Sequence, residues 1–238
     1  MLMNAPAPFD ALKKPDAPAP LSARVAAVSA LSDPARRALF DLVSRSPGSV
    51  TRDAAAEAAG LSRSTTAFHL DRLAELGLLE VEYKRLSGRS GPGAGRPAKL
   101  YRRASTELSV SVPERHYDLA GDVLASAIEL SAASGQPIHD ALRTVAQAKG
   151  NQAGSRASSL PEALEQNGFE PVTDDDDLVF GNCPFHRLAQ HHTAIVCALN
   201  YEFVNGLAAG AGDDAHTVVS DADAGRCCIR ISPRTAGA

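Results

Sequence analysis

Apolar side chains recur at helical spacing through much of residues 21–77 and at strand spacing on either side of the glycine-rich stretch that follows. Between residues 62 and 77, Thr66, Leu70 and Leu73 recur at intervals of three and four, which places them on one face of a helix. The pattern predicts helices over residues 21–30, 33–46, 51–59 and 62–77, followed by strands over residues 78–83 and 98–103.

Hydroxyl residues and glycines divide this stretch into a helix-turn-helix unit. Thr51 and Ser62 are suited to cap two successive helices, because their side-chain oxygens accept hydrogen bonds from free backbone N–H groups. Gly60 interrupts the helical pattern between them, and Gly77 ends the second helix. In such a unit the second helix lies in the major groove of DNA. We interpret the strand hairpin behind it as the wing of a winged helix.

The second helix of this unit has a buried face and an outward face. Thr66, Leu70 and Leu73 are expected to pack on the preceding helices. Phe68 lies on the opposite side, where its ring either contacts thymine methyl groups or packs under the wing. The alternative is a solvated helix with an incidental Phe. The residues of this helix that we expect at the DNA are Arg63, Ser64, Thr65, Ala67, Phe68 and Arg72.

Residues 84–103 form a basic segment around the expected wing. The segment contains seven Lys or Arg and no Asp or Glu, and four glycines lie in its loop. Arg89 and Arg96 are near the tip, where arginine suits insertion into a narrow minor groove. A run of charge is often only a solvated face, but the position beside the second helix favours nucleic-acid contact. We therefore expect Arg89, Arg96 and Lys99 to contact DNA.

Three stretches resemble the winged-helix transcriptional regulators of the ArsR-like superfamily: LSDPARRALFDLV, LSRSTTAFHLDRLAELGLLEVEY and GRPAKLYRR. The shared features are an Asp-Pro-x-Arg helix start, a His-Leu-x-x-Leu core and Gly-Leu-Leu before the wing. The resemblance covers residues 21–105 and implies DNA binding. ArsR-type metal sensors often carry cysteine ligands in the helix-turn-helix region, whereas residues 1–110 contain no Cys. Any sensing site must therefore lie in the second half of the chain.

The second half of the chain alternates between helical and extended patterns. We expect helices over residues 114–133, 138–148, 161–167 and 193–208, a loop over residues 150–159, and strands over residues 169–173, 178–180, 216–220 and 226–232. The predicted fold class is α+β. We expect a disordered tail at residues 1–20, a winged helix-turn-helix domain at 21–105, a helical linker and dimerisation segment at 106–158, and a C-terminal effector domain at 159–238.

Charge is distributed unevenly between the two halves. Residues 1–110 carry 16 Lys or Arg against 11 Asp or Glu, whereas residues 111–238 carry 8 against 17. The basic half is the one suited to a polyanion. The sequence has no run of eighteen apolar residues and no pattern of an export leader, so we expect a cytoplasmic protein without a membrane partner.

All four cysteines lie between positions 183 and 228. In a cytoplasmic chain such clustering favours metal or redox chemistry over disulfides. If residues 226–232 form a strand, alternation turns Cys227 inward with the isoleucines and leaves Cys228 outward between Arg226 and Arg230. Cys197 is expected on the inward face of its helix, and Cys183 in the loop that leads into that helix.

Three inward cysteines suggest a metal or iron–sulfur site. Cys183, Cys197 and Cys227 could hold zinc or an iron–sulfur cluster, with a fourth ligand from His186, His191 or His192. The spacing lacks the Cys-x-x-Cys pairs of zinc ribbons, and free cysteines are often simply buried. The segment NCPFHRLAQHHTAIVCALN with GRCCIRI is similar to the C-terminal part of SufR-type regulators. That resemblance implies an iron–sulfur cluster held by the same three cysteines.

These features favour a homodimeric, non-enzymatic regulator that binds double-stranded DNA and senses a ligand through its C-terminal half. Dimerisation would place two reading helices about 34 Å apart on a pseudo-palindromic site. One alternative is an enzyme with Cys183 or Cys228 as nucleophile and His186 or His191 as base, but no orienting third residue is identifiable. A further alternative is a scaffold that uses the winged helix for protein contacts.

Overall fold

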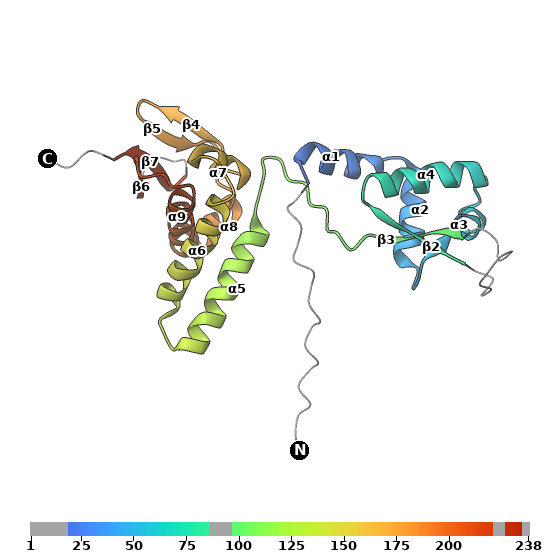
Figure 1. The fold of residues 1–238 in the computed structure, drawn as a ribbon, viewed down its shortest axis with the longest axis horizontal. Coiled ribbons are helices and arrows are strands. Elements are labelled where there is room, and N and C mark those ends of the chain that lie inside the picture. The colour runs from blue at the N-terminus through green and yellow to red at the C-terminus, as the bar shows by residue number, and fades with distance from the viewer. Residues whose placement is uncertain (1–18, 86–96, 221–226, 235–238) are drawn as a thin grey trace, which may run out of the picture. The chain divides into compact units, whose positions relative to one another are not determined.

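The computed structural model describes residues 19–85, 97–220 and 227–234, which belong to two compact units divided after Val110 (Figure 1). The described residues of the first unit form four helices and a small antiparallel sheet of strand order β1-β3-β2. Its elements are α1 (Leu21–Ala30), α2 (Pro34–Arg45), β1 (Val50–Thr51), α3 (Arg52–Ala59), α4 (Arg63–Glu75), β2 (Leu79–Lys84) and β3 (Ala98–Arg103).

The predicted capping residues begin the helices of this unit. The side chain of Asp33 accepts a hydrogen bond from the N–H of Arg36, that of Thr51 from Ala54, and that of Ser62 from Thr65. Gly60 and Gly77 adopt the left-handed backbone conformation (φ of 65° and 74°) that stops α3 and α4. The helix-turn-helix predicted from these local signals is therefore present.

The core of the first unit forms where α4 meets the other helices and the sheet. Thr66, Leu70 and Leu73 are fully buried, as the helical pattern predicts. His69 is also buried, beside them on the same helix. Tyr101 on β3 closes the core from the sheet side, and its strand pairs with both β1 and β2. The expected wing residues Arg89 and Arg96 lie outside the described residues.

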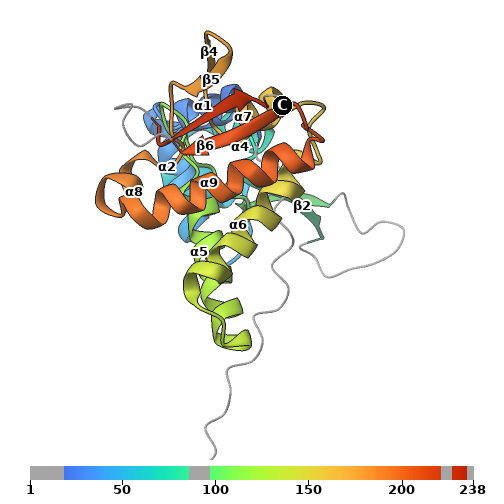
Figure 2. The same cartoon turned by 90° about the vertical axis from the view of Figure 1, so that its left-hand side faces the viewer.

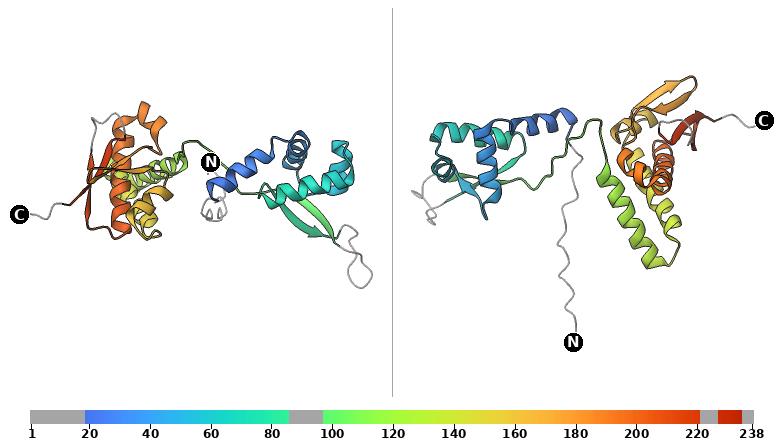
Figure 3. Two further views of the ribbon diagram at one scale, coloured as in Figure 1. Left: turned by 90° about the horizontal axis from the view of Figure 1, so that it is seen from above. Right: turned by 180° about the vertical axis from the view of Figure 1, so that it is seen from behind.

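The second unit is α+β, with a four-stranded antiparallel sheet of order β4-β5-β7-β6. Figure 2 shows α9 crossing beside α6, and both views of Figure 3 show α5 and α6 as a hairpin. Its elements are α5 (Tyr117–Ser134), α6 (Ile138–Gly154), α7 (Leu160–Gln166), β4 (Pro171–Asp174), β5 (Asp177–Phe180), α8 (His186–His191), α9 (Thr193–Gly210), β6 (His216–Ser220) and β7 (Ile229–Pro233).

Helix α6 continues through residues that the sequence pattern assigns to a loop. The loop predicted over residues 150–159 begins only at Ser155, because Gly150 and Gly154 let α6 touch the backbone of α9. A Cβ atom on Gly150 would lie 2.1 Å from the carbonyl oxygen of Phe203. From α9, Gly206 and Gly210 approach α6 equally closely. A glycine taken alone favours a loop. Here the glycines instead let the backbones of the two helices touch, and the helix continues through them.

Other elements also differ from the predicted ones. Helix α5 begins at Tyr117 rather than at residue 114, because residues 114–116 make hydrogen bonds to a neighbouring loop. The short helix α8 occupies residues expected to form a loop. Strand β7 begins at Ile229 rather than at residue 226. Both α5 and α6, which the sequence pattern assigned to a linker, share one hydrophobic core with α9.

None of the helices in the described part of the chain combines the length and the apolar character needed to cross a membrane.

Candidate functional site

The outward face of α4 is open to solvent along its N-terminal half. Arg63, Ser64, Thr65 and Phe68 are exposed, as is Arg72 further along the helix. Phe68 keeps 64% of its surface exposed and meets the neighbouring ring of His69 edge-on, with 5.5 Å between the ring centres. The sequence predicts that the ring either contacts thymine methyl groups or packs under the wing. No residue that the structure describes covers it. The predicted residue Ala67 is half-buried.

Three hydroxyl groups gather at the first turn of α4. The hydroxyl oxygen of Ser62 accepts the backbone N–H of Thr65 at 3.1 Å. The same oxygen lies 3.0 Å from the hydroxyl of Ser64 and 2.8 Å from that of Thr65. These side chains are therefore held together at a helix N-terminus, where short polar groups and free N–H groups can meet an anion or a base edge.

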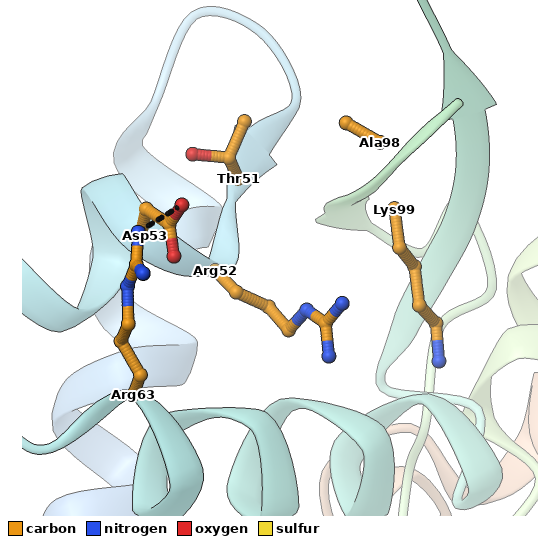
Figure 4. A pocket seen from close by; sticks show the side chains of 6 residues that line it. All are labelled: Thr51, Arg52, Asp53, Arg63, Ala98 and Lys99. Carbon is orange, nitrogen blue, oxygen red and sulfur yellow. Dashed lines mark ion pairs between the residues drawn. The ribbon is translucent and has the colours of Figure 1, made fainter. Parts of the chain in front are cut away.

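A cavity of about 330 Å³ lies beside this turn, between the start of α3 and the start of β3 (Figure 4). In Figure 4, the side chain of Arg52 extends between the Asp53–Arg63 ion pair on one side and Lys99 on the other. The residues that line the cavity are Thr51, Arg52, Asp53, Arg63, Ala98 and Lys99. The lining thus contains three cations against one carboxylate and includes the N-terminus of α3.

The cations of the cavity differ in how they are paired. Arg63 contacts Asp53 at 2.6 Å, but both side chains are more than half exposed, so the pair is weak. Lys99 binds Asp71 at 2.5 Å with its side chain 23% exposed. Arg52 makes no hydrogen bond or ion pair with any residue that the structure describes. Arg52 is therefore the cation of this cavity that is available to a ligand.

Asp71 joins α4 to the wing strand. Its Oδ1 accepts hydrogen bonds from the ammonium of Lys99 and from the hydroxyl of Tyr101, each at 2.5 Å. Burial raises the pKa of Asp71, but these two hydrogen bonds outweigh that effect and hold the pKa below its usual value. Burial and the Asp71 carboxylate raise the pKa of Tyr101. Lys99, predicted to contact DNA, is thus engaged in fixing β3 against α4.

The second unit brings all four cysteines together. Cys183 follows β5, Cys197 lies on α9, and Cys227 and Cys228 precede β7. The thiols interact in a continuous series, in which Cys183 meets Cys227, Cys227 meets Cys228, and Cys228 meets Cys197. We call these four side chains the thiol cluster. The three cysteines predicted to act together do lie together, and Cys228 joins them.

The predicted outward position of Cys228 is wrong. It rested on a strand that begins at residue 226, whereas β7 begins at Ile229 and both cysteines precede it. Ile229 and Ile231 are buried as alternation requires, and Arg230 pairs with Asp177 at 2.8 Å. Because the two cysteines lie outside the strand and the chain bends at Cys228, both can face the cluster rather than opposite sides of a sheet.

The hydrogen bonds among the thiols separate their pKa values. Hydrogen bonds to Cys183 and Cys228, together with burial, raise the pKa of Cys227, which is the donor. The hydrogen bond from Cys227 lowers the pKa of Cys228 to about 6, and it also lowers that of Cys183. Burial raises the pKa of Cys197. Cys228 is therefore the thiol that is most readily ionised at neutral pH.

Asn200 completes this cluster from α9. It is almost fully buried, and its side-chain amide donates to the sulfur of Cys227 at 3.5 Å and supports the thiolate of Cys228. Its Oδ1 is buried without a hydrogen-bond partner among the described residues.

The three histidines expected to supply a fourth ligand do not join the cluster. His186, His191 and His192 are exposed, and Nε2 of His186 lies 3.2 Å from the amide nitrogen of Gln190. Within the described ranges, no three His, Cys, Asp or Glu side chains are arranged to enclose a metal ion. The thiols therefore meet pairwise and do not form a preformed metal cage.

Sequence reasoning missed several polar residues in and around these sites. Arg52 could have been identified because it follows the N-cap of the first helix of the helix-turn-helix. Asn182 precedes Cys183 directly, but its burial at 6% exposure has no sequence signal. Asp71 and Arg115 act through partners 28 to 68 positions away, so the local pattern contains no sign of them.

A family model described as a helix-turn-helix domain matches residues 31–82. A comparison with curated proteins finds no match. Among solved structures, the chain is similar to human N-acetylserotonin methyltransferase in complex with SAM at 16% identity, over 61% of this chain and 51% of that chain. The chain thus spans about half the length of that protein, and with a TM-score of 0.23 the similarity carries no argument. The matched residues cover α2, α3, α4 and much of β2, so the chain carries a helix-turn-helix domain of the kind found in DNA-binding regulators.

Proposed function

We propose that the protein is a transcriptional regulator that binds duplex DNA through α4 and the adjoining cavity and senses a thiol-binding ligand in its second unit. The observation that carries the proposal is the exposed first turn of α4, where hydroxyls, an aromatic ring and a cationic cavity lie side by side. Phosphate contacts fix a protein on DNA and base contacts specify the sequence, and this surface offers both.

The cavity is suited to a backbone phosphate. A phosphate there would meet the guanidinium of Arg52 and the N-terminus of α3, both of which favour negative charge. The carboxylates of Asp53 and Asp71 are already paired with Arg63 and Lys99. Binding therefore leaves the existing ion pairs intact and adds Arg52 as a new contact.

The outward face of α4 supplies the groups that would read bases. Ser64 and Thr65 carry short hydroxyls that reach base edges without filling the major groove, and Phe68 offers an apolar surface for a thymine methyl group. Two copies of the chain would present two such helices about 34 Å apart to a site with two half-sites. We include the homodimer in the proposal on this ground.

The chemistry of the thiol cluster fits a thiophilic metal or an iron–sulfur cluster. Thiolates are the ligands that both groups take, and Cys228, with its pKa lowered to about 6, is ionised at neutral pH. The residues that would hold the group are Cys183, Cys197 and Cys227, with Cys228 in place of a histidine. A bound iron–sulfur cluster would supply a reversible change of charge, whereas zinc would supply only a cross-link between segments.

DNA binding is tested by fluorescence anisotropy with labelled random duplexes at several salt concentrations. Affinity is expected to fall steeply with salt, since Lys and Arg contacts release condensed counterions. Arg52→Ala should weaken binding to all sequences and reduce the salt slope by about one. The control Arg187→Ala removes the same charge from an exposed position of the second unit and should behave as the wild type. An affinity that does not change with salt concentration would refute the proposed interface. An Arg52→Ala variant with the same affinity and salt slope as its control would refute it as well.

The cluster is tested by iron, zinc and sulfide analysis of protein purified without oxygen. Serine at any of the four cysteines should lower the bound metal, while His191→Ala should retain it because that side chain is exposed and is not among the groups that act on the thiols. Wild-type protein without iron or zinc would remove the metal from the proposal.

A further inference from the structure

The first residues of the second unit are attached to the loop that carries Cys183. The chain enters this unit at Ser111, and α5 does not begin until Tyr117. We call residues 111–116 the connector. The helical sequence pattern extends back to residue 114. The residues immediately before α5 are therefore kept out of the helix by the hydrogen bonds that they make to other residues.

Arg115 makes the central contacts of the connector. Its guanidinium Nη1 donates to the side-chain oxygen of Asn182, to the carbonyl of Cys183 at 3.3 Å and to the carbonyl of Glu114 at 3.0 Å. Its backbone N–H donates to the hydroxyl of Ser111 at 2.8 Å. One side chain therefore joins the connector to the backbone of a cluster residue.

Asn182 returns the contact from the loop. It is buried at 6% exposure, and its amide group donates to the carbonyl of Glu114 at 3.0 Å and to that of Gly168 at 2.9 Å. The N–H of His116 donates to the carbonyl of Pro184 at 3.2 Å. Gly168 leaves room for this arrangement, since a Cβ there would lie 2.6 Å from the ring of His116.

Cys183 is therefore held on two sides. Its carbonyl is bound by Arg115 of the connector, and its thiol interacts with Cys227 of the cluster. The residues on either side of it, Asn182 and Pro184, are bound to the connector as well. A change that displaces the thiol of Cys183 must move a loop whose backbone carries the connector with it.

We propose that Arg115 and Asn182 are positioning residues that couple the state of the thiol cluster to the connector, the first residues of the second unit. The ligand class is any group that bonds to the thiols and breaks the contact between Cys183 and Cys227. When the thiols bind the ligand, the connector loses its hydrogen bonds to the loop that carries Cys183. When the ligand leaves, these hydrogen bonds form again. Its direct consequence for DNA rests on the proposed function, whereas the coupling within the second unit does not.

The test uses full-length protein and reversible blocking of thiols with methyl methanethiosulfonate. In this reaction a thiolate attacks the sulfenyl sulfur, a new S–S bond forms, and methanesulfinate leaves. Hydrogen–deuterium exchange is measured by mass spectrometry on peptides that span residues 111–117. Blocking should raise the exchange rate of these amides several-fold in the wild type, and dithiothreitol should reverse the change.

Arg115→Lys separates geometry from charge. Lysine keeps the positive charge, but its compact ammonium on a flexible stem replaces the planar guanidinium that holds Nη1 among its three acceptors. The connector of this variant should exchange rapidly before blocking and show no further response. Lys149→Ala removes a cation that pairs with Asp122 elsewhere in the same unit, and this control should retain the wild-type response. An unchanged connector in blocked wild type, or a full response in Arg115→Lys, would overturn the inference.

A second arm measures DNA affinity with and without blocking. Allosteric coupling of usual size predicts a change of roughly fivefold or more in the wild type and none in Arg115→Lys. Wild-type protein that fails to bind DNA would refute the proposed function, while the exchange experiment would still decide the coupling. Equal changes of affinity in both proteins would refute the role of Arg115.

Discussion

The outward surface of α4 in the first unit and the thiol cluster of the second unit use polar groups in opposite ways. At the first turn of α4 the charged side chains are exposed and paired singly, as in the ion pair between Arg63 and Asp53. In the thiol cluster, four side chains interact in series and Asn200 is buried against them. Exposed pairs contribute little and act almost independently, whereas buried polar networks gain or lose stability as a whole.

The two units should therefore respond differently when a single residue is changed. A surface whose contacts are nearly independent can bind a polyanion with an affinity that each residue changes by a small amount. A buried network responds to one altered member by rearranging several.

Gly150→Val should unfold the second unit selectively. The Cβ atom of the new side chain would lie 2.1 Å from the carbonyl oxygen of Phe203. Because Cβ is attached directly to the backbone, no change of rotamer relieves this overlap. We expect a loss of about 3 kcal/mol or more. Thermal unfolding followed by circular dichroism should show the loss or early melting of one transition, with the other unchanged.

Gly121→Ala is the matched control for that substitution. It also replaces a helical glycine of the second unit, but a Cβ there meets nothing within 4 Å. Alanine should stabilise the helix by about 0.5–1 kcal/mol. Equal destabilisation by both variants would contradict the role given to close contact between α6 and α9.

Cys227→Ala should slow the alkylation of Cys228 at pH 7 by roughly tenfold or more, because the thiolate fraction falls as the pKa returns toward its ordinary value. In the wild type the reaction should be half-maximal near pH 6, the value to which the Cys227 hydrogen bond lowers the pKa. Iodoacetamide labelling over a pH series, read by mass spectrometry, measures both. A midpoint near pH 9 in the wild type would mean that the thiols do not interact.

Asp71→Asn should destabilise the first unit by about 1–2 kcal/mol at pH 7, since it weakens hydrogen bonds from Lys99 and Tyr101 in a partly exposed site. The folded-state pKa of Asp71 is lowered, so its contribution is present above the unfolded pKa and disappears as the pH falls through the folded value. Urea titrations over a pH series should therefore show wild type and variant converging in acid. A constant difference would contradict the role of the carboxylate charge.

Asp53→Ala should have the smallest effect on stability, less than about 0.5 kcal/mol, because its ion pair with Arg63 is exposed. The same change frees a cation beside the cavity, so nonspecific DNA affinity should rise slightly. Urea denaturation and anisotropy measure the two effects separately. A large loss of stability would show that exposed pairs in the first unit also act as a network.

The two units also differ in how far their folds follow from sequence. Thr51, Gly60 and Ser62 act on neighbours within four positions, so they could be identified before the structure was known. Gly150 looks like a loop residue until α9 lies against it. Cys228 could not be placed from alternation, because the start of β7 depends on pairing with other strands. Local signals decide the first unit, and contacts distant in sequence decide the second.

Selection of binding sites from a random duplex library tests the central claim most directly. Wild-type protein should enrich a motif with two half-sites separated by about ten base pairs, and Phe68→Ala or Ser64→Ala should change the preferred bases within each half-site. Arg52→Ala should lower affinity while leaving the motif unchanged, because phosphate contacts carry no sequence information. No enrichment by the wild type, or the same motif from wild type and both α4 variants, would contradict the assignment of α4 as the reading helix.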